Sequence, residues 1–256
     1  MNKGNYSSLM GKVSLDLGNL RLSWMLNNNY SQSRGYSHVY KYNPDGRSYS
    51  DANTSLMMVQ LNHFLNEKMF YDIKYSITDN NYGSYVFEDY DSYEVIKENG
   101  IYQGVYRFEG DTVYNYVNDK YMTAYGTGFF TGGQDKGYTK RATISKNFKT
   151  TFNWQATNAH SIKAGVSATF YDLQNTYHTI RNAYAGTELE SNNYKPIVLP
   201  DSTVYSDMYS VEPKEASFFL QDKFERDEIV INFGLRYDTF DANTYYPVSY
   251  THLRAH

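Results

Sequence analysis

The sequence predicts an all-β fold of about eight antiparallel strands arranged as four hairpins. Apolar and polar residues alternate along paired runs, which is the pattern of strands with one apolar face. Tight-turn residues join the runs within each pair, and long polar segments separate the pairs. Aromatic residues make up 18% of the chain, with 29 tyrosines, although the mean hydropathy is only -0.68. Tyrosine suits surfaces where a polar and an apolar medium meet, so we expect many such boundaries.

The first two hairpins have clear turns. The first is expected over residues 9–26, around a Gly-Asn turn at 18–19 that tolerates positive φ. The second is expected over 54–78, around an Asn-Glu-Lys turn at 66–68. Its returning run, 69–77, has the most regular alternation in the chain, which predicts a half-buried strand there.

The other two hairpins lie in the second half of the chain. One is expected over residues 139–173, with its turn near 158–160. The last is expected over 215–240, with an Arg-Asp turn at 226–227. Its second run, 229–237, places apolar side chains at every second position, so one face of this hairpin must meet an apolar medium.

The connections between the hairpins are long and polar. They cover residues 27–53, 79–138 and 174–214, and the longest contains an Asn-Gly signal for a small hairpin near 98–101. Tight turns and long connections alternate, so all tight turns should lie at one end of the sheet. This asymmetry is typical of outer-membrane proteins. We therefore predict a fragment of an antiparallel transmembrane β-barrel with short periplasmic turns and long extracellular loops.

The alternation also assigns the two faces of the wall. Trp24 and Trp154 fall on the apolar face, where we expect lipid or an interfacial belt. Lys74, Arg236 and Asp238 fall on the polar face and are predicted to point into the lumen.

Several functional classes find no support in the sequence. The net charge of -4 disfavours nucleic acid as a partner, and the absence of cysteine excludes disulfides and thiolate metal sites. There is no apolar run long enough for a transmembrane helix and no apolar segment of a signal peptide at the start. The histidines lack metal-binding spacing, and no nucleophile, phosphate or calcium motif is recognisable. We expect no enzyme activity, no catalytic residue, no metal and no cofactor.

Two strand segments carry a family resemblance. Residues 215–223, which end in Gln-Asp-Lys, and residues 231–238, which contain Gly-Leu-Arg-Tyr-Asp, resemble barrel strands of TonB-dependent outer-membrane receptors. Residues 161–172 are similar to an upstream strand of that family. The resemblance covers residues 139–173 and 215–244 well, whereas the remainder is similar only in its general pattern.

The resemblance implies a location and a set of partners. Family members are barrels of about 22 strands closed by a plug domain. They lie in the outer membrane of Gram-negative bacteria and import a scarce nutrient, such as a siderophore, vitamin, glycan or peptide, with energy delivered by TonB. The implied partners are outer-membrane lipid, TonB and the plug domain in the intact protein, the nutrient ligand, and a surface lipoprotein as an optional partner. Residues 1–248 correspond to part of the barrel, and 249–256 are interpreted as a non-native tail. This fragment alone is not expected to transport.

Aromatic loop residues are the candidate binding site. Tyrosine rings stack on sugars, aromatic siderophores and peptides at little entropic cost. The alternative is that they pack the loops together or form an interfacial belt. The candidates lie in the longest connection: Tyr82, Tyr85, Tyr90, Tyr93, Tyr102, Tyr106, Tyr114 and Tyr116.

Two other functions stay open at the level of sequence. One is a different outer-membrane barrel, either a porin or an adhesin-like protein, which a plug domain encoded upstream would exclude. The other is a soluble all-β glycan-binding surface protein, which would refold as a monodisperse β-rich species without detergent.

Overall fold

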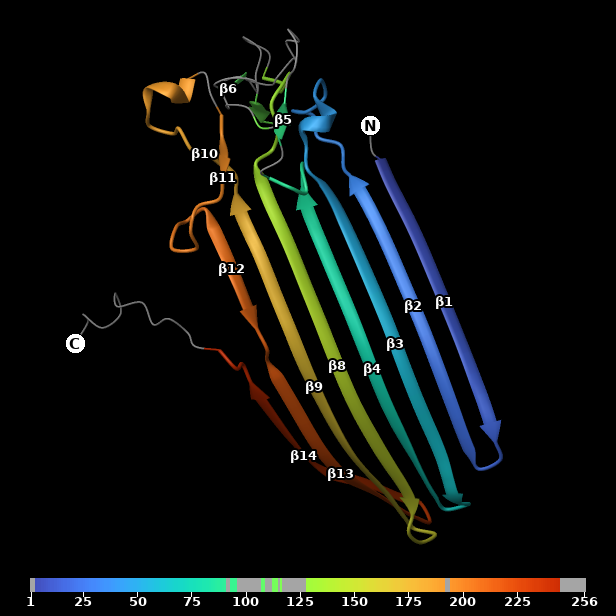
Figure 1. Cartoon of the computed structure of the whole chain (residues 1–256). Coiled ribbons are helices and arrows are strands. Elements are labelled where there is room, and N and C mark those ends of the chain that lie inside the picture. Colours follow the sequence, from blue (N-terminus) through green and yellow to red (C-terminus); the bar gives the residue numbers. More distant parts are fainter. Residues whose placement is uncertain are drawn as a thin grey trace, which may run out of the picture.

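The fold is one large antiparallel sheet, whose strands run side by side along the molecule (Figure 1). The computed structural model describes residues 3–90, 93–95, 107–108, 112–114, 116, 128–191 and 194–244. In these ranges the strand order is β1-β2-β3-β4-β8-β9-β13-β14, with β12 paired to β9 as a ninth strand. The predicted all-β class and the antiparallel arrangement are confirmed.

The strands of this sheet form the four predicted hairpins. They are β1 (Lys3–Leu17) with β2 (Leu20–Arg34), β3 (Tyr49–Asn66) with β4 (Met69–Tyr85), β8 (Gly137–Gln155) with β9 (His160–Thr179), and β13 (Lys214–Arg226) with β14 (Ile229–Asp241). The four tight turns gather at one end of the sheet, and the long connections lie at the other (Figure 1). The asymmetry predicted from the sequence is therefore present in the fold.

The turn positions differ from the prediction in detail. The predicted turn at 18–19 is confirmed, with Gly18 at φ 74°. In the last hairpin Arg226 still pairs with Ile229, so the turn lies one residue later, with Asp227 at φ 52°. In the third hairpin His160 is already the first residue of β9.

The strands are longer than predicted on the side of the loops. Residues 27–34 continue β2, residues 79–85 continue β4 and residues 174–179 continue β9, although all three segments were predicted to be loop. The reason is that both faces of these extensions are polar, so the alternation that reveals a half-apolar strand is missing there.

A second strand segment pairs with the extended part of β9. β12 (Ser206–Val211) pairs with β9 from residue 173 to 178, and β13 pairs with β9 from 160 to 170. Pro213 separates β12 from β13, since proline has no N–H to donate to a ladder. The N–H of Tyr171 still donates to the carbonyl oxygen of Pro213, at 3.0 Å, so β9 stays paired across the break.

The small elements all lie at the loop end. They are a three-stranded sheet of β5 (Tyr93–Val95), β6 (Arg107–Phe108) and β7 (Thr112–Tyr114), the pair β10 (Arg181–Asn182) and β11 (Pro196–Ile197), and two 3-10 turns, η1 (Pro44–Gly46) and η3 (Glu188–Ser191). The hairpin predicted near 98–101 lies outside the described residues. None of the described helical segments is long and apolar enough to cross a membrane.

Strand register sorts the side chains onto an apolar and a polar face. A central row of the apolar face crosses seven strands and contains Val13, Trp24, Val59, Tyr75, Phe148, Ala168 and Ala216. The next residue positions form a row on the other face, with Ser14, Ser23, Gln60, Lys74, Lys149, Ser167, Ser217 and Asp238. The faces predicted for Trp24, Trp154, Lys74, Arg236 and Asp238 are confirmed.

The apolar face forms a band with a defined upper margin. On β4 the band covers Met69–Ile77, which matches the length of about 9–11 residues that a membrane strand needs. The next position on this face is Asp79, in one row with Asn28 and Ser55 on the neighbouring strands. Above this row the apolar band gives way to polar residues.

One acidic residue interrupts the apolar band near the tight turns. Asp222 lies between Ile162 and Phe233, which are its partners on the adjacent strands. One of its carboxylate oxygens is 2.7 Å from the Nδ1 of His160. The carboxylate is therefore not left without a polar partner on this face.

Candidate functional site

A cluster of aromatic side chains joins the loops to the upper end of the sheet. Its buried members are Tyr85, Tyr116, Tyr138, Ile180 and Tyr194, and Tyr49, Phe87, Tyr90 and Val198 pack against them. We call this set, together with His178, the loop cluster. Tyr116 and Ile180 are 1% and 0% exposed, whereas most large side chains of the apolar band are exposed. The tightest packing of the described chain therefore lies at the loop end.

Ring stacking holds the loop cluster together. The rings of Tyr138 and His178 lie parallel, with centroids 4.5 Å apart and an interplanar angle of 5°. Tyr138 also stacks on Tyr85 at 5.4 Å. Tyr90 meets His178 edge to face at 5.8 Å, so the imidazole has an aromatic neighbour on two sides. Such contacts are worth about 0.5–1.5 kcal/mol each beyond the area that they bury.

Hydrogen bonds tie the cluster to the backbone of the loops. The hydroxyl of Tyr138 donates to the carbonyl oxygen of Glu88 at 3.1 Å, and that of Tyr194 donates to the carbonyl oxygen of Ile180 at 3.0 Å. The Nζ of Lys140 is 3.1 Å from a carboxylate oxygen of Glu88 and lies over the ring of Tyr85. The loop following β4 is thus fixed against β8.

Three polar atoms of the cluster are buried without a hydrogen-bond partner in the described chain: Nδ1 and Nε2 of His178 and the hydroxyl oxygen of Tyr116. Burial lowers the pKa of His178 because a charged imidazole would lose its hydration. Burial likewise raises the pKa of Tyr85 and Tyr116. The interior of the loop cluster is therefore kept uncharged.

A polar pocket of about 360 Å³ opens beside the loop cluster. It is lined by Asp51, Asn81, Tyr82, Gly83, Tyr85, Glu88, Lys140, Arg141, Ala142, Gln174 and Thr176. A side chain at Gly83 would collide with the Asp51 carboxylate and the Tyr85 ring, so glycine lets these two groups approach. Carboxylates, amides and cations line the pocket, which suits a polar ligand with both donors and acceptors.

The predicted tyrosines fall into four groups. Tyr82 is 39% exposed and its hydroxyl is 3.3 Å from Ser50 Oγ, so its ring is available to a ligand. Tyr85, Tyr90 and Tyr116 belong to the loop cluster, where Tyr85 and Tyr116 are buried and pack the loops together. Tyr93 and Tyr114 pair across β5 and β7, and Tyr102 and Tyr106 lie outside the described residues. Ligand binding by these residues stays a prediction.

The structure adds residues that the sequence did not single out. Tyr138, His178 and Tyr194 complete the loop cluster from β8, β9 and the segment before β11. Their positions far apart in the chain gave no local signal. In the described part of the chain no group of three or more His, Asp or Glu side chains is placed to hold a metal ion.

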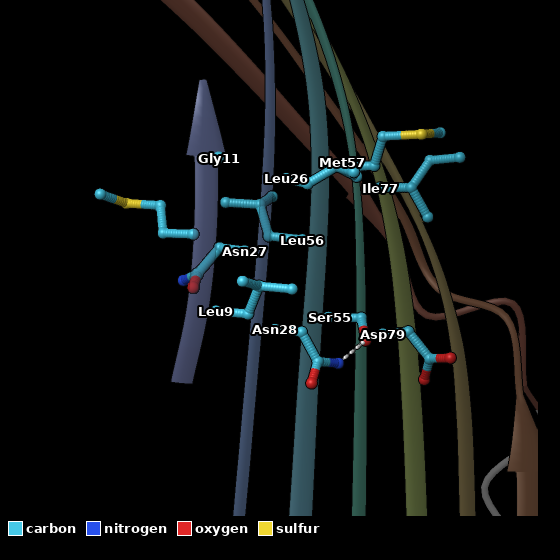
Figure 2. A pocket seen from close by; sticks show the side chains of 11 residues that line it. Leu9, Gly11, Leu26, Asn27, Asn28, Ser55, Leu56, Met57, Ile77 and Asp79 are labelled. Carbon is cyan, nitrogen blue, oxygen red and sulfur yellow. Dashed lines mark hydrogen bonds between the residues drawn. The ribbon is translucent and has the colours of Figure 1, made fainter. Parts of the chain in front are cut away.

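A second depression, an apolar groove of about 370 Å³, lies on the apolar face near its upper margin (Figure 2). The lining residues are Leu9, Met10, Gly11, Leu26, Asn27, Asn28, Ser55, Leu56, Met57, Ile77 and Asp79, from β1, β2, β3 and β4. The groove contains one carboxylate and no cation.

Comparison with known proteins gives a distant structural likeness. No protein-family model matches the chain, and no curated protein matches it. Among solved structures, the chain is similar to the ferric preacinetobactin receptor from Acinetobacter baumannii, with 10% sequence identity and a TM-score of 0.49. The likeness covers 93% of this chain and 34% of that receptor, so the chain spans much less than the length of the receptor.

Proposed function

We propose that the chain is a segment of the wall of an outer-membrane β-barrel receptor of the TonB-dependent kind. In the intact protein, the loops of such a receptor capture a scarce nutrient for energy-coupled import. The observation that carries the proposal is the two-faced sheet, which is apolar on one side, polar on the other, and joined by tight turns at one end only. Lipid against the apolar face and a water-filled lumen against the polar face account for the two different faces of the sheet.

The exposure of the apolar face supports lipid as its partner. Trp24, Val59 and Phe148 are 43%, 39% and 39% exposed in the middle of the sheet. Soluble monomers rarely expose a contiguous apolar patch larger than a few hundred Å². A soluble surface protein would have to cover this face with a second layer, and the described residues contain none.

The ladder of the sheet supports the same conclusion. Strands can cross a bilayer only when their backbone N–H and C=O groups pair with one another. The strands between β1 and β14 are paired on both sides along the apolar band. In the part of the chain that the structure describes, the sheet is open, with β1 and β14 at its two edges, and it does not enclose a lumen. We therefore expect it not to transport alone.

The loop end supports a role in ligand capture. Beside the polar pocket, the ring of Tyr82 is exposed and the loop cluster holds the neighbouring chain rigidly. A rigid support lowers the entropic cost of binding. The nutrient, the plug domain, TonB and a surface lipoprotein belong to this proposal as partners of the intact receptor.

Cysteine labelling in lipid tests the orientation of the wall. The chain has no cysteine, so single substitutions give clean labelling sites. Val59→Cys lies on the apolar face and Gln60→Cys on the polar face, at neighbouring positions of β3. After labelling with a nitrobenzoxadiazole maleimide and reconstitution into lipid vesicles, the emission should shift to the blue at residue 59 and not at 60. Equal emission at both positions would contradict a membrane wall.

Labelling of intact cells tests the sidedness. A membrane-impermeant maleimide should react from outside with Gly35→Cys in the loop after β2. It should react with Glu67→Cys in the tight turn after β3 only once the outer membrane is opened. The reverse pattern would place the tight turns outside. A plug domain encoded upstream in the same gene would then identify a TonB-dependent receptor and exclude a porin or an adhesin-like protein.

A further inference from the structure

Two lysines lie directly opposite each other in the middle of the polar face. The strand register pairs Lys74 of β4 with Lys149 of β8. The next residues along the two strands, Tyr75 and Phe148, belong to the apolar face, so both lysine side chains lie on the polar one. Paired side chains of this kind have Cβ atoms about 4.5–5.5 Å apart, and like charges directly opposite each other are destabilising. The wall therefore holds two positive charges together at a cost in stability.

The surrounding side chains do not neutralise this lysine pair. Gln60 and Ser167, which flank it on β3 and β9, are uncharged. In the rows directly above and below the pair on β4 and β8, the one acidic residue is Asp72. Within the described chain, the Asp72 carboxylate forms no ion pair with either lysine. One carboxylate beside two ammonium groups also leaves a net positive charge.

The polar groups around the lysine pair bond to one another and not to the ammonium groups. The amide of Gln60 donates to Asn62 Oδ1 at 3.2 Å, and the amide of Asn147 donates to Thr169 Oγ1 at 2.7 Å. Among the described residues, none accepts a hydrogen bond from either lysine. Each ammonium carries three donors, so these donors are available to a ligand with several oxygen acceptors.

We propose that Lys74 and Lys149 form an anion site, which binds a phosphate group or two neighbouring carboxylates of a small solute. The hydroxyl of Ser76, in the next row on β4, supplies a further donor. The position of this site inside a lumen rests on the proposed function. Lys74 lies within the stretch of β4 that forms the apolar band, so the site is below the loops. It would bind a negatively charged nutrient after capture, during its passage through the barrel.

The paired charges select the class of ligand. A divalent anion compensates both ammonium groups, whereas chloride compensates only one. Lysine is a compact point charge on a flexible stem, so two lysines can adjust to anionic groups of different size. Multivalent oxyanions should therefore bind more tightly than monovalent anions at this site.

A titration of the full chain tests the site. The protein, labelled with carbon-13 at lysine Cε, is folded in micelles of an uncharged maltoside detergent, so that the detergent supplies no charge. Inorganic pyrophosphate or citrate is added while sodium chloride keeps the ionic strength constant, and the lysine signals are followed by NMR. Lys163 of β9 is the matched control, because it lies on the same face opposite the uncharged residues Asn153 and Gln221.

The expected result is saturable binding at the lysine pair. The signals of Lys74 and Lys149 should shift along one common binding curve. Lys74→Gln and Lys149→Gln should each raise the Kd for pyrophosphate about five-fold, which is the factor given by one exposed ion pair. Lys163→Gln should leave the Kd unchanged. Lys149→Glu, which places opposite charges face to face, should abolish binding and raise the urea midpoint in chloride above that of the unmodified chain.

The outcomes separate this inference from the proposed function, because the titration needs no bilayer. Absence of a saturable shift at the two lysines would overturn the anion site, whatever the labelling in vesicles shows. An equal loss of affinity in Lys163→Gln would also overturn it, since the whole face would then attract anions without a specific site. Saturable binding together with equal emission of the two labelled cysteines would keep the anion site and refute the membrane wall.

Discussion

At the scale of single residues, a glycine on the polar face has a defined partner. Gly165 is directly opposite Phe219 on the neighbouring strand. A Cβ atom added to Gly165 would lie 2.3 Å from the Phe219 ring and 3.0 Å from the carbonyl oxygen of Thr150. The ring therefore covers the bare backbone of the glycine, which shields a position that is otherwise weak in a strand.

Gly165→Ala should destabilise the sheet by about 1–3 kcal/mol, because the new methyl group forces the Phe219 ring and the backbone apart. The matched control is Gly11→Ala, where nothing lies within 4 Å of the new Cβ. The control should be neutral or stabilise by about 0.5 kcal/mol, since alanine loses less entropy than glycine. The measurement is the urea midpoint of β-sheet circular dichroism in detergent micelles.

A second comparison makes this prediction specific. If the cost comes from the ring, Gly165→Ala should cost much less in a Phe219→Ala background, and the two changes should be non-additive. Equal costs in both backgrounds would show that the carbonyl oxygen of Thr150, and not the ring, limits the space.

At the scale of elements, the hairpins were predictable and their upper ends were not. Residues 69–77 alternate because one face is apolar, and this contrast is visible in the sequence. Residues 79–85 continue the same strand with polar side chains on both faces, so their pairing comes from the neighbouring strands and leaves no local pattern. The sequence therefore reveals the apolar band but underestimates the length of the strands.

The same limit applies to the loop cluster. The tyrosines of the longest connection were predicted to bind a ligand, with packing of the loops as the alternative, and Tyr85 and Tyr116 are buried in the loop cluster. Their partners Tyr138, His178 and Tyr194 are brought to them by strand register and loop closure, which a single sequence does not encode locally. The sequence therefore did not reveal these three members of the loop cluster, and ligand binding by the loop tyrosines stays a prediction.

The loop cluster should loosen in mild acid because of His178. Its pKa is lowered by burial, so the unfolded chain, with a pKa of about 6.5, binds a proton more readily than the folded one. The stabilisation is complete above about pH 6.5 and is lost as the pH falls below this value towards the lowered pKa. Near-UV circular dichroism of the tyrosines between pH 7.5 and 4.5 should record the loss.

His178→Phe keeps an aromatic ring beside Tyr138 and removes the titration, so the signal should become independent of pH over this range. The matched control is His63→Phe at the other end of the sheet, where the ring contacts Tyr71. An unchanged pH profile in His178→Phe would assign the acid sensitivity to another group.

At the scale of the whole molecule, a charged side chain should affect the stability of the sheet differently on its two faces. Val59 and Gln60 are adjacent on β3 in the middle of the sheet and point to opposite faces. Val59→Lys should reduce the free energy of folding into lipid vesicles by about 2–4 kcal/mol, as expected for a lysine at the bilayer midplane. Gln60→Lys should change it by less than about 0.5 kcal/mol. Urea titration of vesicle-bound protein measures both, and equal effects would contradict the assignment of the faces.

The extension of β9 past the apolar band has a consequence for how the receptor would work. From Asp172 to Thr179 this strand rises about 23 Å along its own axis, at roughly 3.3 Å per residue. In the proposed membrane wall, these extended strand ends would form a collar that holds the aromatic loops above the lipid surface. A large ligand that diffuses outside the cell would then reach the loops before it reaches the lipid head groups. The height of the collar, and not only the chemistry of the loops, would therefore determine which molecules are bound.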